Sequence, residues 1–220
     1  MADVVVFGVK DFASLAHFYL RHDSPHRVVA FTVNREYVPA AAEFEGLPVV
    51  PFEELESRFP PDRVSAFAPM SHRKMNRARK EVYEALKSRG YPLISYVSSR
   101  ATTFPGGQIG DNCFILEDNT IQPFATIGDN VVVWSGNHIG HHSTVRDHAF
   151  ITSHVVISGH CDIGSYSFLG VNATLKDQIV LGEGTLVGMA AIITKSTEPW
   201  SLYKADSTRA SKVSSKDIDF

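Results

Sequence analysis

The stretch IQPFATIGDNVVVWSGNHIGHHSTVRDHAFITSHVVISGHCDIGSYSFL, residues 121–169, carries an aliphatic residue at every sixth position. The period continues in both directions without a slip, and it places Ile, Leu or Val at Ile109, Ile115, Ile121, Ile127, Val133, Ile139, Val145, Ile151, Ile157, Ile163, Leu169, Leu175, Leu181, Val187 and Ile193. An α-helix turns every 3.6 residues and cannot keep such a series on one face. A parallel β-helix can, because each hexapeptide stacks its apolar residue on those above and below. The repeat therefore predicts a parallel β-helix.

The first 96 residues follow a different pattern, in which short apolar runs alternate with amphipathic segments. The predicted strands cover residues 4–8, 28–33, 64–70 and 93–97. One predicted helix follows Asp11, a candidate N-cap, and another covers residues 73–89, where Gly90 ends it. Strand, helix and strand in this order predict a right-handed βαβ unit and a small parallel sheet. We therefore expect a Rossmann-like α/β domain over residues 1–96.

Composition narrows the functional classes. The chain has 220 residues, 44% of them hydrophobic and 20% charged, which is typical of a soluble globular protein. Its net charge of −3 argues against nucleic-acid binding, which needs a basic surface. No apolar run approaches the roughly 20 residues that span a bilayer, and Asp3 followed by a strand does not resemble a signal peptide. With only Cys113 and Cys161, which we expect to be buried thiols, the sequence predicts a cytoplasmic protein without a membrane partner.

The unbroken repeat resembles that of the hexapeptide-repeat transferases. The resemblance implies a left-handed β-helix, a triangular prism with eighteen residues per coil, so that the fifteen repeats make about five coils. It also implies homotrimers that hold acyl-CoA between neighbouring prisms. A small Rossmann-like domain followed by the prism is similar to the bacterial nucleotide-aminosugar N-acetyltransferases of surface-glycan synthesis and to the sialic acid O-acetyltransferases. On this basis we expect an acetyl-CoA:sugar acetyltransferase whose substrates are acetyl-CoA and a nucleotide sugar, with no metal.

In the family that the chain resembles, a histidine on the second or third coil is the catalytic base. The repeat register places it at His141, within the segment Asn137–Val145. Many relatives have an acidic residue next, which orients the ring, whereas this chain has His142. Asp147 or a group from a neighbouring subunit is the alternative partner. An imidazole with a pKa near 6.5 accepts a proton from a bound ammonium at neutral pH, and the amine then attacks the thioester directly.

Candidate binding residues follow from position in the same family. For the nucleotide sugar, they are Gly8, Val9, Thr32, Asn34, Arg35, Ser71, Arg73 and His138. The loop after the first strand keeps only Gly8, so the G-x-G-x-x-G dinucleotide fingerprint is absent. For CoA, they are Phe150, Gly170, Val171, Gly188, Met189 and Lys195. Trp134 and Phe150 are aromatic residues that either stack on a ligand or fill a subunit interface.

Six of the ten histidines lie between His138 and His160, and this density leaves a second interpretation open. The γ-class carbonic anhydrases resemble the prism and bind zinc with histidines from neighbouring chains, and such a site activates water. Of the histidines that share one place in the hexapeptide, only His142 and His160 are eighteen apart, and they should stack at about 4.8 Å. A sugar O-acetyltransferase and a scaffold without catalysis are the remaining alternatives. We expect the domains to cover residues 1–96 and 97–205, followed by a polar tail, 206–220.

Overall fold

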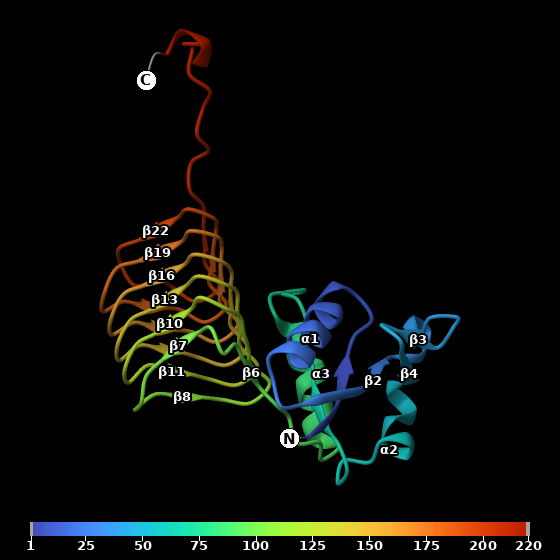
Figure 1. Cartoon of the computed structure of the whole chain (residues 1–220). Coiled ribbons are helices and arrows are strands. Elements are labelled where there is room, and N and C mark those ends of the chain that lie inside the picture. The colour runs from blue at the N-terminus through green and yellow to red at the C-terminus, as the bar shows by residue number, and fades with distance from the viewer. Residues whose placement is uncertain (1, 219–220) are drawn as a thin grey trace.

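The computed structural model describes residues 2–218, and it places a small α/β domain beside a tall prism of stacked strands (Figure 1). The α/β domain contains a five-stranded sheet in the order β3-β4-β2-β1-β5. Its members are β1 (Asp3–Phe7), β2 (Arg27–Val33), β3 (Glu43–Phe44), β4 (Leu47–Pro51) and β5 (Ser65–Phe67). All neighbours are parallel except β3, which forms a hairpin with β4. The predicted α/β domain is therefore confirmed, and the hairpin is an addition that the sequence did not predict. The predicted strand 93–97 does not join this sheet: Leu93 forms only an isolated bridge with Ala66, and Tyr96–Val97 belongs to the prism.

The helices of this domain lie on both faces of the sheet. Helix α1 (Asp11–His22) buries Ala13, Ala16 and Leu20 against one face, whereas α2 (Leu55–Arg58) and α3 (Arg77–Ser88) bury Leu55 and Leu86 against the other. Short 3₁₀ helices cover Arg35–Tyr37 and Phe52–Glu54 in this domain, and another covers Ser215–Asp217 in the C-terminal tail. None of the helices within residues 2–218 is both long enough and apolar enough to cross a membrane.

Two helix starts differ from the prediction. Lys10, and not Asp11, is the N-cap of α1, so Asp11 lies in the first turn, where a carboxylate favours the positive end of the helix. Helix α3 begins at Arg77 and not at residue 73, because Lys74, Met75 and Asn76 all have positive φ angles that a right-handed helix cannot contain.

The prism has three walls of parallel strands, and each strand has two residues. The first wall contains β6 (Tyr96–Val97), β9 (Phe114–Ile115), β12 (Val132–Val133), β15 (Phe150–Ile151), β18 (Phe168–Leu169), β21 (Leu186–Val187) and β23 (Leu202–Tyr203). The second wall contains β7 (Thr102–Thr103), β10 (Thr120–Ile121), β13 (His138–Ile139), β16 (Val156–Ile157), β19 (Thr174–Leu175) and β22 (Ile192–Ile193). The third wall contains β8 (Gln108–Ile109), β11 (Thr126–Ile127), β14 (Thr144–Val145), β17 (Asp162–Ile163) and β20 (Val180–Leu181). The left-handed β-helix is confirmed, and it begins at Tyr96 and so extends beyond the fifteen predicted repeats.

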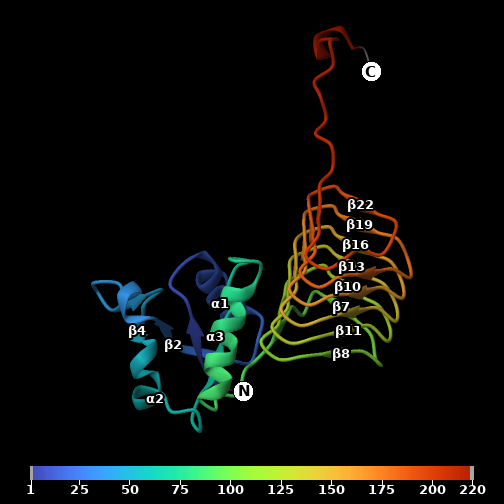
Figure 2. The same cartoon turned by 180° about the vertical axis from the view of Figure 1, so that it is seen from behind.

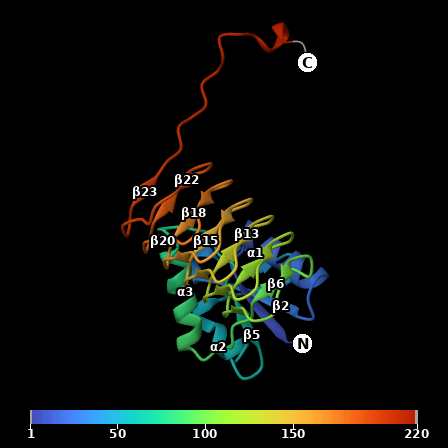
Figure 3. The same ribbon diagram turned by 90° about the vertical axis from the view of Figure 1, so that its left-hand side faces the viewer.

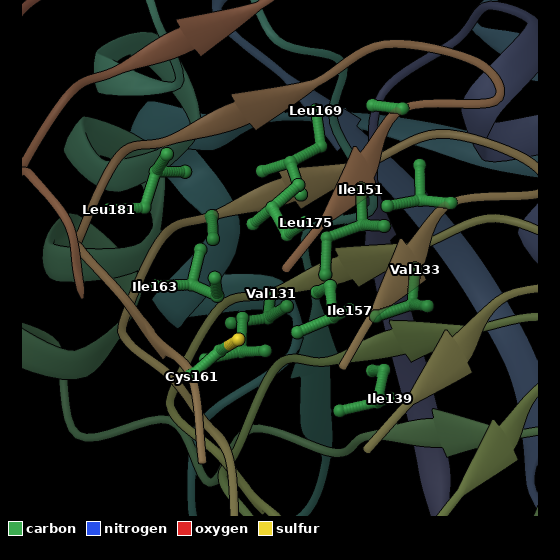
Figure 4. Packing of buried hydrophobic residues seen from close by; sticks show 14 of the residues in the cluster. Val131, Val133, Ile139, Ile151, Ile157, Cys161, Ile163, Leu169, Leu175 and Leu181 are labelled. Atoms are coloured by element: carbon green, nitrogen blue, oxygen red, sulfur yellow. The ribbon is translucent and has the colours of Figure 1, made fainter. Parts of the chain in front are cut away.

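The repeating aliphatic residues form the core of the prism (Figure 4). Ile139, Ile157 and Ile163 have no exposed surface, and Ile139 pairs in register with Ile121 and Ile157. The register repeats every eighteen residues, which is one coil. Cys113 and Cys161 are buried free thiols in this core, as predicted.

The two domains share a second core. Phe114, Val132 and Phe150 face outward from the first wall and pack against the side of the α/β sheet that carries α1. Arg79 of α3 is completely buried between the domains, where its guanidinium donates hydrogen bonds to the carbonyl oxygens of Asn130, His148 and Ala149. Figures 1 and 2 show that the α/β domain lies beside the first coils, and Figure 3 shows the tail leading away from the last coils. The first wall of the prism and the α/β domain are therefore packed against each other through buried apolar and hydrogen-bonded contacts.

Candidate active site

Three histidines gather at one corner of the prism, where the second wall turns into the third wall. We call this region the histidine corner, and it comprises the turns at residues 122–125, 140–143 and 158–161. The rings of His142 and His160 stack at a centroid distance of 4.9 Å with an angle of 12° between them, close to the spacing predicted from the repeat. The ring of His141 lies edge-on to both, at 5.3 Å from His142 and 5.0 Å from His160. All three side chains are exposed, so a ligand has access to them.

His141 is anchored at its backbone. Its N–H donates a hydrogen bond of 2.9 Å to Oε1 of Gln122 on the preceding coil, and its carbonyl oxygen accepts one from the N–H of His160 on the next coil. The Nδ1 atoms of His141 and His142 lie 3.1 Å apart, so the ring of one histidine donates a hydrogen to the other. The backbone is therefore held by both adjacent coils, while the imidazole remains open to a substrate.

Gly159 provides the surface on which the imidazole of His141 rests. A Cβ atom at this glycine would lie 2.8 Å from Cε1 and 2.9 Å from Nε2 of His141. Gly159 stands two places after the aliphatic residue of its repeat, and the fourteen equivalent positions hold Asp, Glu, Pro, Ser, His, Val, Met or Lys. Its φ is not among the positive values, so the backbone does not require glycine there. The position therefore holds glycine because the ring of His141 occupies the space that a side chain would need.

The other histidines of the cluster lie at different corners. His148 and His154 each occupy the same turn position as His142 and His160, but they lie at the two remaining corners of the prism. His148 is nearly buried beside Tyr83, and it receives a hydrogen bond of 2.9 Å from the Asn130 amide. Burial lowers the pKa of His148 below its ordinary value. These two residues are not part of the histidine corner.

The structure does not bring Asp147 to His141 within one chain. Asp147 lies in the next turn, at the corner between the third and first walls, where its Oδ1 accepts a hydrogen bond of 2.8 Å from the N–H of Asp129. The ring of His142 does contact that of His141. Of His142 and Asp147, only His142 therefore reaches His141 within one chain. His138 lies on β13 beside Thr120 and Val156, on the outer face of the second wall.

The expected nucleotide-sugar residues collect at one edge of the α/β sheet. Gly8 and Val9 follow β1, Asn34 and Arg35 follow β2, and Ser71 and Arg73 follow β5 in the loop before α3. Because β2, β1 and β5 are parallel neighbours, these loops lie together at the carboxyl ends of the strands, where open α/β sheets bind ligands.

The contacts of individual residues show which of these candidates have a side chain free to bind a ligand. Thr32 is buried, and its hydroxyl donates to the carbonyl oxygen of Val50, so it serves the sheet. The Arg35 side chain pairs with Glu54 at 2.7 Å, and its N–H donates to the carboxylate of Glu53. Asn34 and Arg73 are exposed.

The expected CoA residues separate into two groups. Gly170, Val171, Gly188 and Met189 lie in successive coils at the corner between the first and second walls, where Val171 and Met189 are exposed. A Cβ at Gly170 would lie 2.5 Å from the backbone nitrogen of Met189, so close stacking of coils explains this glycine. Lys195 is exposed after β22.

Phe150 does not have the free surface that we expected of a CoA contact. It is 2% exposed in the core between the domains, 6.2 Å from the ring of Phe12 and 5.2 Å from that of His72. Trp134 packs edge-on against Phe12 in the same core. The physical reason is that outward-facing aromatic residues of the first wall are covered by the α/β domain of the same chain.

Sequence reasoning missed Gln122 and Gly159 as neighbours of His141. Both lie in the coils next to it, eighteen or nineteen residues away, so the eighteen-residue register contained the signal. It missed Arg79 as well, because a lysine- and arginine-rich segment looks like a solvated helix face when the partner domain is not considered.

Comparisons with known proteins agree with this architecture. Residues 106–141 and 124–159 match the family "Bacterial transferase hexapeptide (six repeats)". No curated protein sequence matches the chain significantly.

Several solved structures have the same two-part fold. A histidine variant of perosamine N-acetyltransferase from Caulobacter crescentus, in complex with CoA and GDP-perosamine, is 20% identical, with a TM-score of 0.82 over 92% of this chain and 93% of that one. The acetyltransferase domain of PglB from Neisseria gonorrhoeae is 20% identical, with a TM-score of 0.79 over 92% and 96%. WeeI from Acinetobacter baumannii is 17% identical, with a TM-score of 0.77 over 90% and 94%. Residues 106–159 are thus similar to bacterial transferase hexapeptide repeats, and the chain shares its fold along nearly its whole length with these solved structures.

Proposed function

We propose that the chain is an acetyl-CoA-dependent N-acetyltransferase whose acceptor is the amine of a nucleotide-linked aminosugar. The observation that carries this proposal is an exposed imidazole, His141, on a prism that is joined to a Rossmann-like domain. Support comes from the similar fold of perosamine N-acetyltransferase, which was crystallised with CoA and GDP-perosamine as two different histidine variants.

In the proposed reaction, His141 acts as the general base. A sugar ammonium has no lone pair, so the neutral imidazole first removes a proton from it. The amine nitrogen then forms a bond to the thioester carbonyl carbon, and the developing oxyanion accepts a hydrogen bond from a backbone N–H. Collapse of this intermediate breaks the carbon–sulfur bond, and the CoA thiolate takes up the proton that the imidazolium carries. The imidazole, neutral again, then accepts the second proton from the new amide nitrogen and releases it to solvent. No covalent enzyme intermediate is needed.

The α/β domain is proposed to hold the nucleotide sugar. The loops at Gly8, Asn34 and Ser71 lie at the carboxyl ends of three adjacent parallel strands, and the N-terminus of α1 follows the first of them. Such an edge offers backbone N–H groups to phosphates and side chains to a base. Asn34 and Arg73 are exposed polar residues in these loops, and we assign them to the base and the diphosphate.

Acetyl-CoA is proposed to lie along the exposed residues Val171 and Met189, between neighbouring prisms of a homotrimer. These side chains, together with Val156 and Ile192 of the second wall, leave apolar surface uncovered in the single chain. A second prism packed against the second wall would cover that surface and form a groove beside it. We also propose that His142 rather than Asp147 steadies the imidazole, since only His142 is adjacent to it within the chain.

The test is a thiol-release assay with acetyl-CoA and a panel of acceptors. The panel contains GDP-, UDP- and dTDP-linked 3- and 4-aminosugars, the matching sugars with a hydroxyl in place of the amine, and free sialic acid. We expect turnover with one class of nucleotide-linked aminosugar and none with its hydroxyl counterpart. Acetylation of the hydroxyl sugar or sialic acid would replace this proposal by a sugar O-acetyltransferase, and silence across the panel would contradict both.

A further inference from the structure

The ring nitrogens of the three histidines in the histidine corner lie close enough together to coordinate one transition-metal ion. The nitrogen ligands that His141, His142 and His160 offer all lie within 4.8 Å of one another. Two nitrogens bound to one tetrahedral zinc ion, each at 2.0–2.1 Å, lie about 3.3 Å apart. The 3.1 Å between the Nδ1 atoms of His141 and His142 is already close to this value. His160 must swing toward the pair by up to about 1.5 Å, and its exposed ring has the freedom to do so.

We propose that the histidine corner binds one divalent zinc ion per chain and that the bound ion blocks His141 as a base. Three imidazoles are the ligand set that zinc accepts while leaving its fourth position open to water or a substrate group. All three ligands come from one chain, at positions 141, 142 and 160, so the site differs from one shared between subunits. The ion acts as a reversible inhibitor here and is not a resident cofactor of acetyl transfer.

The blockade follows from the chemistry of a single imidazole. A neutral ring has one nitrogen with a lone pair and one that carries a hydrogen. If the lone pair of His141 binds zinc, the other nitrogen keeps its hydrogen, and neither nitrogen accepts a proton from the acceptor amine. This part of the inference rests on the proposed function, whereas metal binding itself does not.

The chain contains its own control for the binding site. His154 has a positive φ like His160, 60° against 57°, and it is also exposed, but it lies at another corner of the prism. Asparagine accepts this backbone conformation, and the equivalent positions 112, 130 and 172 already hold it. His160→Asn and His154→Asn are therefore matched substitutions that differ in whether they remove a ligand.

The experiment measures zinc binding to the full chain, freed of any histidine tag and of bound metal, by equilibrium dialysis and by the visible spectrum of Co²⁺ as a substitute ion. We expect one Zn²⁺ per chain and a tetrahedral Co²⁺ spectrum. His160→Asn should weaken binding by at least about tenfold, since even an outer partner of a metal ligand contributes that much. His154→Asn should change it less than about twofold, and Mg²⁺, which prefers oxygen ligands, should not compete.

Absence of saturable binding, or equal weakening by both substitutions, would overturn the metal site. In the second arm, Zn²⁺ should slow acetyl transfer by wild type, and a chelator should restore it, each variant being compared with its own metal-free rate. Transfer that continues unchanged at saturating zinc would overturn the blockade. Zinc binding in a chain that transfers no acetyl group supports the metal site and counts against the proposed function alone.

Discussion

Replacement of Gly159 by alanine tests whether the imidazole of His141 must lie where the structure places it. The new methyl carbon would lie 2.8 Å from Cε1 and 2.9 Å from Nε2 of that ring. Carbon atoms in good contact lie about 3.5–4.0 Å apart, so the ring must retreat by about 0.7–1 Å. A misplacement of about 1 Å at a reacting group is able to cost about 100-fold in rate. We therefore expect kcat to fall about 10- to 100-fold in Gly159→Ala.

The assay is steady-state thiol release with the acceptor that the proposed panel identifies, together with thermal unfolding. The melting temperature should change little, because the backbone at this place in the repeat accepts side chains in the fourteen other hexapeptides. Ser165→Ala is the matched control, since Ser165 has the same place in the next repeat but belongs to another corner. It should keep the wild-type kcat.

A double-mutant cycle with His141→Ala separates the two possible causes of lost activity. If Gly159 acts through the ring, the double variant should be no slower than His141→Ala alone, because the ring that the methyl group displaces is already gone. Wild-type kcat in Gly159→Ala, or a loss that adds fully to that of His141→Ala, would refute the reasoning. The first result would show that the position of the ring does not matter, and the second would show that the glycine acts elsewhere.

Three further predictions concern catalysis, stability and pH. His141→Ala should lower turnover at least about 100-fold while leaving the melting temperature and the oligomeric state nearly unchanged, because a positioned general base contributes about 10²–10⁴-fold; turnover near wild type would remove it as the base. Arg79→Met should lower the free energy of unfolding in urea by about 3 kcal/mol or more, because several buried carbonyl oxygens lose a charged donor, and a loss under about 1 kcal/mol would contradict this. Burial lowers the pKa of His148, so the imidazole binds a proton at a higher pH in the unfolded chain than in the folded chain. The free energy of unfolding is therefore unaffected by this residue well above pH 6.5, and it decreases as the pH falls below 6.5. His148→Asn should flatten the dependence of stability on pH between about 5 and 7, and an unchanged slope would count against this assignment.

The prism could be predicted almost completely from the hexapeptide period. A strict six-residue spacing fixes which residues point inward, and the eighteen-residue coil fixes which residues are stacked, so the 4.9 Å contact of His142 and His160 followed from counting. The α/β domain was predicted less well. Its short hairpin, Glu43–Pro51, depends on a turn at Glu45 and Gly46 whose flanking strands are too short to show alternation. Local pattern is a weak guide where an element has few residues.

Contacts between the domains were outside the reach of the sequence. An aromatic residue such as Phe150 is expected to stack on a ligand, and an arginine such as Arg79 is expected to face solvent. Both are instead buried in the same interface, where the guanidinium lies 5.6 Å from the centre of the phenyl ring. The place of Phe150 in the hexapeptide and that of Arg79 in the helix predict that both side chains point outward. What covers them depends on the position of the other domain, which the sequence pattern does not give. For the same reason, the register could not decide what orients the ring of His141.

The backbone itself explains most of the histidine cluster but leaves one member unexplained. His142, His148, His154 and His160 all stand where the turn requires a positive φ, a conformation in which histidine, like asparagine and aspartate, is several-fold enriched. The turn conformation alone is thus a sufficient reason for these four. His141 has no positive φ and stands at a place where other repeats hold aspartate, serine, proline or methionine. Its side chain lies over the repeat's single glycine at that place, on the coil above. The turn does not require this ring, and the next coil leaves room for it, so His141 is distinguished among the histidines by a role outside folding.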